Sequence, residues 1–205
     1  MSHQPDDVTA KDAGGGFTPH SEGQFAMLCV DVVNLGTNVE QYQDKPPREV
    51  PKVALVFASG ERHDKADGGE QFLKIVTVEM ALSANEKANL RKFLESWRGK
   101  TYTPEQAEQG LPVTKLYAQP ALVSIEHVLT RKARRFAKIA SISPLPKAMP
   151  APDKAILTEY ERPKFFADRK TEYAAALTKH REANGGAPVP DAPNGDEGSD
   201  DDLPF

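Results

Sequence analysis

Apolar residues gather in short runs along the chain, and most of these runs have the length and composition of β-strands. Three come first, at residues 25–33, 53–58 and 72–80, and two more follow at residues 121–129 and 136–142. They are rich in valine, isoleucine and phenylalanine, and polar turns separate several of them. The pattern therefore predicts five strands.

A helical periodicity lies between the third and the fourth run. Its apolar face follows the spacing i, i+3, i+4, i+7 and consists of Leu90, Phe93, Leu94 and Trp97. Ser83 and Glu86 have the spacing of a capping box, which predicts that the helix begins near residue 83, and Gly99 supplies a stop signal. We expect Trp97 to lie in the core.

Two further helices are expected from shorter signals. One begins near Thr103, where proline, glutamate and glutamine follow. The other covers residues 165–182 and places on one face Phe166, Lys170, Tyr173 and Leu177. This helix either packs on the strands or mediates self-association, and the stretch between Pro150 and Phe165 is expected to be extended.

Three strands, a helix and then two strands is the element order of the OB-fold, a five-stranded barrel that binds oligonucleotides. We therefore expect a mainly β (α+β) protein, an OB-fold barrel with a helix between its third and fourth strands. An additional C-terminal helix and disordered termini complete the expected fold. Element order alone also allows another small barrel or a sandwich.

The two ends of the chain have the composition of disordered segments. The first contains few apolar residues and ends in three glycines, and a later stretch is rich in glycine and proline. The expected organisation is a disordered leader at residues 1–16, an OB-fold domain at 17–150, an extended segment plus helix at 151–183, a flexible linker at 184–198 and an acidic interaction tip at 199–205.

Composition narrows the functional classes. The chain has 39% apolar residues and a mean hydropathy of -0.56, and no apolar run is long enough to span a bilayer. The first residues lack the order of a signal peptide, so we expect a cytoplasmic protein without a membrane partner, in the host cytoplasm if it is viral. Cys29 is the only cysteine, which excludes an intrachain disulfide and favours a buried thiol.

The net charge of -4 is unevenly distributed along the chain. Residues 1–15 hold one base and three acids, and residues 184–205 hold six acids and no base, which leaves 25 bases and 21 acids between them. A mildly basic body with an acidic tail is typical of a polyanion-binding domain whose tail competes for the same groove.

The last residues of the sequence combine three carboxylates with a short apolar end. They are Ser199, Asp200, Asp201, Asp202, Leu203, Pro204 and Phe205. A benzyl group and an α-carboxylate on one terminal residue would suit a partner pocket with an apolar floor and a basic lip. Pro204 lowers the ordering cost of docking. The alternative is a tail that only adds solubility.

This tip closely resembles that of bacterial single-stranded DNA-binding proteins, which end in Asp-Asp-Asp-Ile-Pro-Phe, with Leu203 in place of the isoleucine. The body is similar to phage-encoded single-stranded DNA-binding proteins over about residues 17–150, in the stretches 22–25, 30–36, 90–100 and 140–147. The resemblance implies an OB-fold, cooperative or multimeric coating of single strands, and recruitment of host or phage replication and repair proteins through the tip.

The chain departs from the bacterial type in two respects. Bacterial relatives usually begin the barrel near residue 1 and stack bases on several tryptophans, whereas this chain has a long leader and one tryptophan. Base stacking is therefore expected of phenylalanine and tyrosine side chains. A homo-oligomer is compatible with the sequence, but the bacterial tetramer is not assumed.

Two clusters are candidate DNA contacts. The denser one spans the turn between the last two strands and comprises Arg131, Lys132, Arg134, Arg135, Phe136 and Lys138. Basic loops can close over a phosphate backbone while an aromatic ring stacks on a base, although a basic hairpin tip can also serve only to prevent edge pairing. The second cluster lies on the second and third strands and comprises Lys52, Phe57, Arg62, Lys65, Phe72 and Lys74. Each phenylalanine of this cluster is more often a core residue than a stacking platform.

Residues 34–50 form a polar excursion, with Tyr42, Lys45 and Arg48, that could also line the groove. No catalytic constellation is recognisable, since the five histidines are scattered and no phosphate-binding glycine loop is present. We expect neither an enzyme nor a cofactor, and one cysteine without paired histidines argues against a metal site.

The sequence thus predicts a protein that coats single-stranded DNA without strong sequence preference during replication or recombination. Two alternatives stay open. A strand-annealing recombination protein could carry the same tail, and a decoy could capture host replication factors through the tip without binding DNA.

Overall fold

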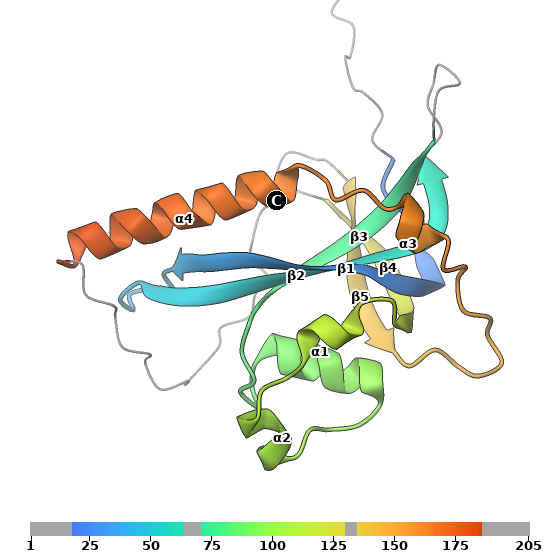
Figure 1. Cartoon of the computed structure of the whole chain (residues 1–205), viewed down its shortest axis with the longest axis horizontal. Coiled ribbons are helices and arrows are strands. Elements are labelled where there is room, and N and C mark those ends of the chain that lie inside the picture. The colour runs from blue at the N-terminus through green and yellow to red at the C-terminus, as the bar shows by residue number, and fades with distance from the viewer. Residues whose placement is uncertain (1–17, 64–70, 130–134, 186–205) are drawn as a thin grey trace, which may run out of the picture.

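The structure, a computed structural model, describes residues 18–63, 71–129 and 135–185. Its centre is one antiparallel sheet of five strands in the order β3-β2-β1-β4-β5 (Figure 1). The strands are β1 (Gly23–Glu40), β2 (Arg48–His63), β3 (Phe72–Ala81), β4 (Pro120–Leu129) and β5 (Arg135–Ser143). The helices are α1 (Asn89–Arg98), α2 (Pro104–Glu108), α3 (Ile156–Glu159) and α4 (Phe165–Ala183), with a short 3-10 helix η1 at Val113–Leu116. The predicted mainly β fold with five strands is confirmed.

β1 is the central strand of the sheet and contains two irregularities. It pairs with β4 on one side and with β2 on the other. Its first part pairs with β4, and the part from Leu28 onward pairs with β2. An extra residue between Cys29 and Asp31 reverses the alternation of side chains, so that Val33 lies on the same face as Leu28. A second irregularity contains Gly36, whose positive φ of 85° is one that glycine adopts without strain.

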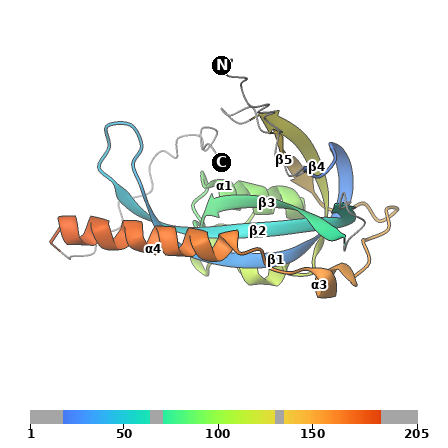
Figure 2. The ribbon, with the colours of Figure 1, turned by 90° about the horizontal axis from the view of Figure 1, so that it is seen from above.

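A hydrophobic layer covers each face of β1 and β2, which is why β2 is apolar on both sides. The first core lies under α1 and receives from β2 the side chains of Val53, Leu55 and Phe57. The second core lies under α3 and α4 and receives Ala54, Val56 and Ala58. Figures 1 and 2 show α4 and α1 on opposite sides of these strands. The unbroken apolar run at residues 53–58 is therefore a strand buried on both faces.

The sheet is open between its two edge strands. Cα atoms of β3 and β5 come within 8 Å of each other. Within the described part of the chain, however, no ladder of backbone hydrogen bonds joins them.

α4 packs along the second core. Two residues of the predicted face, Phe166 and Tyr173, are buried, whereas Leu177 is half-buried and Lys170 is exposed. Of the two roles considered for the helix, packing on the sheet is therefore observed. The Tyr173 hydroxyl donates a hydrogen bond to the carboxylate of Glu79 on β3, and Arg181 donates two to Glu49 on β2, at 2.8 and 2.6 Å.

Three local predictions need correction. α1 begins at Asn89 without a side-chain cap, because Ser83 instead accepts a hydrogen bond from the backbone of Asn85 in the preceding turn. The stretch expected to be extended contains α3. Most of the predicted polar excursion at residues 34–50 belongs to β1 and β2, because α4 covers one face of these strands and keeps Leu35 buried.

Other local predictions are confirmed. Gly99 ends α1 in the left-handed conformation with φ 66°. Thr103 caps α2 through a capping box with Gln106. Cys29 is buried, and burial raises the pKa of its thiol to about 12. Within the described ranges, no helix has the length and apolar character that crossing a membrane requires. The predicted leader, the tip and all but the first two residues of the predicted linker lie outside the described residues.

Candidate nucleic-acid interface

The β4–β5 hairpin presents basic and apolar side chains at its described end. Leu129 pairs with Arg135 in the strand register, and Val128 pairs with Phe136. Arg135 and Lys138 are exposed, Phe136 is half-buried, and Leu129 is 68% exposed. Three further predicted contacts, Arg131, Lys132 and Arg134, belong to the connecting segment and lie outside the described residues. Cations and apolar groups together can meet both the phosphates and the bases of an unpaired strand.

The β2–β3 hairpin carries the second predicted cluster. Phe72 pairs with His63 in the strand register and is 54% exposed, so about half of its surface is open to solvent. Arg62, the basic residue beside His63 on β2, is also exposed. Lys65 lies outside the described residues. Phe72 is therefore the member of this cluster that fits a stacking platform best.

Phe57 is a correction to the predicted cluster. Its side chain is fully buried, with its ring 5.3 Å from that of Trp97 and 6.2 Å from that of Phe93. The ring therefore has no face available to a base. Trp97 is a core residue as predicted, and its indole N–H donates to the Pro120 carbonyl at 3.0 Å.

Three predicted bases are already engaged by carboxylates of the same chain. Lys52 is 2% exposed and lies 2.5 Å from Glu40, and Lys74 is 8% exposed and lies 2.7 Å from Glu61. Burial of these lysines beside their carboxylates makes them parts of the fold and poor contacts for phosphate. Arg62 is paired at 2.5 Å with Glu159 of α3, but both partners are partly exposed, so a phosphate could compete for this arginine.

His20 joins the two hairpins at their roots. Its Nε2 lies 2.7 Å from Ser59 Oγ, and its Nδ1 lies 3.1 Å from Glu61 Oε2, both on β2. Its backbone carbonyl lies 2.7 Å from Nε2 of His127 on β4. The described ends of the β2–β3 and β4–β5 hairpins thus leave the sheet from one junction. Sequence reasoning missed it because 39 residues separate His20 from Ser59 and 107 separate it from His127.

The charges at this junction are balanced. Burial acts to raise the pKa of Glu61, but hydrogen bonds from Lys74 and Ser21 outweigh it and lower the pKa to about 2. Burial lowers the pKa of His20 below its ordinary value of 6.5, against the opposing effects of the Ser21 carbonyl and of Glu61. The junction at neutral pH therefore holds a neutral histidine beside a paired carboxylate.

Ser59, His20 and Glu61 follow the hydrogen-bond order of a hydrolytic triad. The His20 side chain, however, is fully shielded from solvent, and both oxygens of Glu61 are occupied, by Lys74 and by groups of Ser21. Glu61 N–H also donates to Ser59 Oγ at 3.3 Å. A ring that no substrate can reach cannot relay a proton to one, so we assign the network a structural role. Among the described residues, no group of three or more potential ligands could hold a metal ion.

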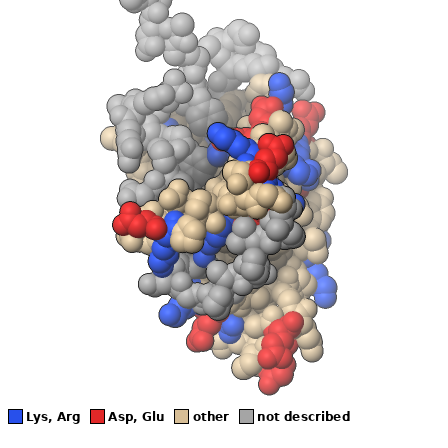
Figure 3. Space-filling view, turned by 90° about the vertical axis from the view of Figure 1, so that its left-hand side faces the viewer, with Lys and Arg blue, Asp and Glu red and all other residues tan. Residues whose placement is uncertain are grey.

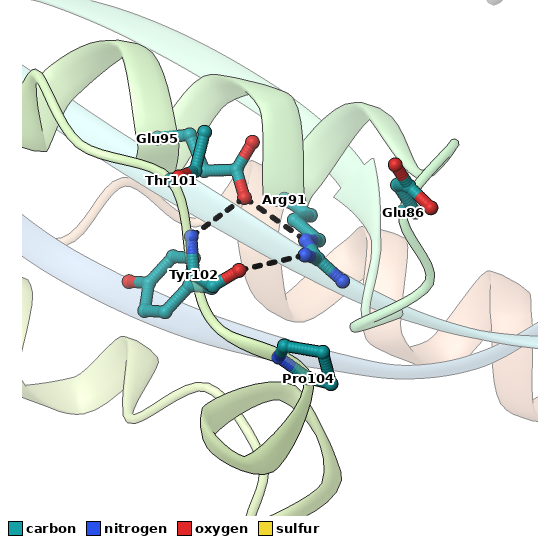
Figure 4. Close-up of a pocket in the computed structure, with 6 residues that line it drawn as sticks. All are labelled: Glu86, Arg91, Glu95, Thr101, Tyr102 and Pro104. Atoms are coloured by element: carbon teal, nitrogen blue, oxygen red, sulfur yellow. Dashed lines mark hydrogen bonds and ion pairs between the residues drawn. The ribbon is translucent and has the colours of Figure 1, made fainter.

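A cleft opens between α1 and the start of α2 (Figure 4). Arg91 dominates it and donates to Glu95 Oε1 at 3.0 Å, to the Ala84 carbonyl at 3.3 Å and to the Tyr102 carbonyl at 3.0 Å. Glu95 Oε1 also accepts from the Tyr102 backbone at 2.9 Å. These groups satisfy one another, and Glu86 adds a negative charge to the lining. The cleft is a structural joint that does not suit an anionic ligand.

The β1–β2 turn was a further candidate surface. Tyr42 is 43% exposed, and Lys45 Nζ lies 5.8 Å from the centre of its ring. Figure 3 shows the end of the molecule that carries this turn and the C-terminal end of α4, with Lys and Arg side chains beside Asp and Glu. Intermixed charges favour a solvated surface, and we do not include this turn in the candidate interface.

No protein-family model matches the chain, and neither does any curated protein or any solved structure. The resemblance to single-stranded DNA-binding proteins therefore stays a prediction from the residues. Functional inference consequently depends on the two hairpin ends, their shared junction and the strand order.

Proposed function

We propose that this chain binds single-stranded DNA without strong sequence preference, through an OB-like barrel, and that Asp200 to Phe205 recruit partner proteins. The observation that carries the proposal is the common root of two hairpins whose ends carry Phe72 on one side and Arg135 with Phe136 on the other. Stacking on such rings contributes about 1–3 kcal/mol per base and tolerates any base, because every base has a π-face.

The sheet supports the OB-like part of the proposal. Its order β3-β2-β1-β4-β5, with β1 paired on both sides, becomes the barrel order if β3 and β5 meet, and these two strands approach each other. α1 follows β3 in the chain, precedes β4 and contacts both edge strands. An OB-fold carries its helix in this place between the third and fourth strands.

A binding titration tests the proposal directly. Fluorescence anisotropy of labelled oligo-dT should show binding at low salt, with much weaker binding to a duplex of the same length. The logarithm of affinity should fall with the logarithm of salt concentration, by about 0.7 per phosphate contact for a single strand. Failure to bind oligo-dT at low salt would contradict the proposal and favour the decoy.

Recruitment by the tip has a separate test. Deleting residues 199–205 should abolish capture of a partner protein and leave oligo-dT binding unchanged or tighter, because the three aspartates of the tip then no longer compete with phosphate. A matched variant with Asp200, Asp201 and Asp202 retained and Phe205 changed to Ala separates the aromatic contribution from the charge. Loss of DNA binding on deletion would show that this division of labour is wrong.

A further inference from the structure

The ends of the two hairpins are not joined by the sheet itself. The ladder between β1 and β2 stops at the pair Leu28 and Ala58, so the last residues of β2 pair only with β3. The ladder between β1 and β4 stops at Gly23 and Ile125. Beyond these positions the described backbone offers no strand pairing that fixes one hairpin end against the other.

Residues 20–22 occupy this place and alternate between the hairpins. The His20 ring bonds to Ser59, and Ser21 Oγ donates to Glu61 Oε1 at 2.8 Å, both on β2. Glu22 Oε1 accepts from the backbone N–H of His127 on β4 at 2.7 Å. His20 is 1% exposed, and its ring packs edge-on against Phe25 at 4.6 Å. We call residues 20–22 the clasp.

We propose that the clasp couples the ends of the β2–β3 and β4–β5 hairpins, and that His20 is the positioning residue that keeps the two halves of the DNA interface in a fixed arrangement. The coupling itself follows from contacts within the chain, whereas its effect on DNA rests on the function proposed above. His20 can perform both connections because its side chain bonds to one hairpin while its carbonyl bonds to the other.

Protonation should weaken the clasp. Neutral His20 accepts a hydrogen bond from the Ser59 hydroxyl at Nε2, while its Nδ1–H faces the Ser21 carbonyl and Glu61. Glu61 is already paired with Lys74, and His127 and Lys74 both add repulsion to a charged ring. Two other pairs of titratable groups surround the His20 ring. Glu22 faces His127 on β4, and His63 on β2 lies near Lys74 and Glu61. The stabilisation is therefore present above the ordinary pKa of 6.5 and is lost as the pH falls through the lowered pKa of His20.

A double-mutant cycle tests the coupling without DNA. Ser59→Ala and His127→Phe each remove one connection, and no hydrogen bond is described between these two side chains. If His20 links them, their effects on the unfolding equilibrium should not be additive, and the coupling should vanish in a His20→Gln background. Additive effects in the native background would overturn the clasp.

Amide hydrogen exchange then shows which hairpin loosens when one connection is removed, and DNA affinity shows whether binding depends on it. In Ser59→Ala, exchange should rise in residues 59–63 and also in residues 126–129, whereas a rise confined to β2 would overturn the coupling. Ser83→Ala, which also removes a hydroxyl bonded to the backbone, should leave both segments unchanged. Oligo-dT affinity should fall at least about fivefold in Ser59→Ala, the lower end of usual coupling between sites.

The pH profile separates positioning from a general loss of structure. In the native chain, oligo-dT affinity should fall on acidification through the pKa of His20, although added positive charge would by itself raise it. His20→Gln should lose this fall in affinity on acidification, and the control His180→Gln on α4 should keep it. Faster exchange with unchanged affinity would overturn the positioning role alone. Absence of DNA binding in the native chain would refute the proposed function, while the exchange result would still decide the clasp.

Discussion

Asp31 connects the sheet to the C-terminal helices through three hydrogen bonds. Arg162 donates to its two carboxylate oxygens at 2.7 and 2.8 Å, and the Tyr160 hydroxyl donates at 3.0 Å. Burial acts to raise the pKa of Asp31, but the hydrogen bonds from Arg162 and Tyr160 outweigh it and lower the pKa. The β1 bulge directs this carboxylate toward the segment that leads from α3 to α4.

Replacing Asp31 by Asn should therefore destabilise the protein. We expect a loss of about 1.5–3 kcal/mol at neutral pH, the usual range for hydrogen bonds to a charged group. Because the pKa of Asp31 is lowered, its contribution to stability is present above pH 3.8 and is lost as the pH falls through the folded-state pKa. Urea unfolding of both proteins at neutral and acid pH measures this. A difference that persists when Asp31 is protonated would contradict the assignment.

Two phenylalanines of the predicted cluster should respond oppositely to truncation. Phe57→Ala should cost about 3–5 kcal/mol of stability, because it leaves a cavity in the first core. Phe72→Ala should cost little stability, because the side chain is 54% exposed, and should weaken oligo-dT binding by about 1–3 kcal/mol. Thermal unfolding and anisotropy of the two variants provide the comparison. Native affinity in Phe72→Ala would remove this ring from the interface.

The local sequence pattern could not show that Phe57 is buried and Phe72 exposed. Both are phenylalanines in strand-like runs, and burial depends on which helix later covers each face. The sequence correctly placed Trp97 in the core because a helical repeat of four apolar residues identifies an inward face. Lys52 and Lys74 were assigned to the surface because their partners, Glu40 and Glu61, become neighbours only in the folded chain.

At the scale of elements, the β4–β5 hairpin should supply phosphate contacts. Changing both Arg135 and Lys138 to Gln should weaken oligo-dT binding and reduce the slope of its salt dependence by up to about 1.4, or about 0.7 for each phosphate that is no longer neutralised. Lys154→Gln with Lys170→Gln removes the same charge from the exposed C-terminal segment and should leave the slope nearly native. Equal slopes in both double variants would indicate only a nonspecific effect of net charge.

The existence and type of most elements could be predicted, whereas several of their ends could not. Apolar runs identified all five strands, but β1 extends seven residues past Val33 to Glu40. Residues 34–40 are mostly polar, so the sequence predicts a loop there. They form a strand because α4, from the far end of the chain, packs against β1. The same problem affects the start of α1, where Ser83 stabilises a turn in place of the helix.

At the scale of the whole molecule, acid should destabilise the protein in two stages. The pKa values of His20 and His63 are lowered, mainly by burial, so their contribution is lost first as the pH falls below 6.5. The carboxylates of Asp31, Glu61 and Glu95 also have lowered pKa values, through their hydrogen-bond partners. Their contribution should be lost at lower pH, as each folded-state pKa is passed, and for Glu61 this pKa is about 2. Thermal unfolding across this pH range checks both stages. Constant stability down to about pH 5 would contradict the first.

Trp97 gives the molecule a convenient optical property. It is the only tryptophan of the chain, it is 6% exposed, and its ring contacts Phe57 within the first core. Its emission should therefore report on unfolding and stay constant while a strand docks at the hairpin ends. Quenching by added oligonucleotide would signal rearrangement of the interior and not base stacking. A dye attached to the DNA is consequently the appropriate probe for binding, and the native fluorophore is the probe for folding.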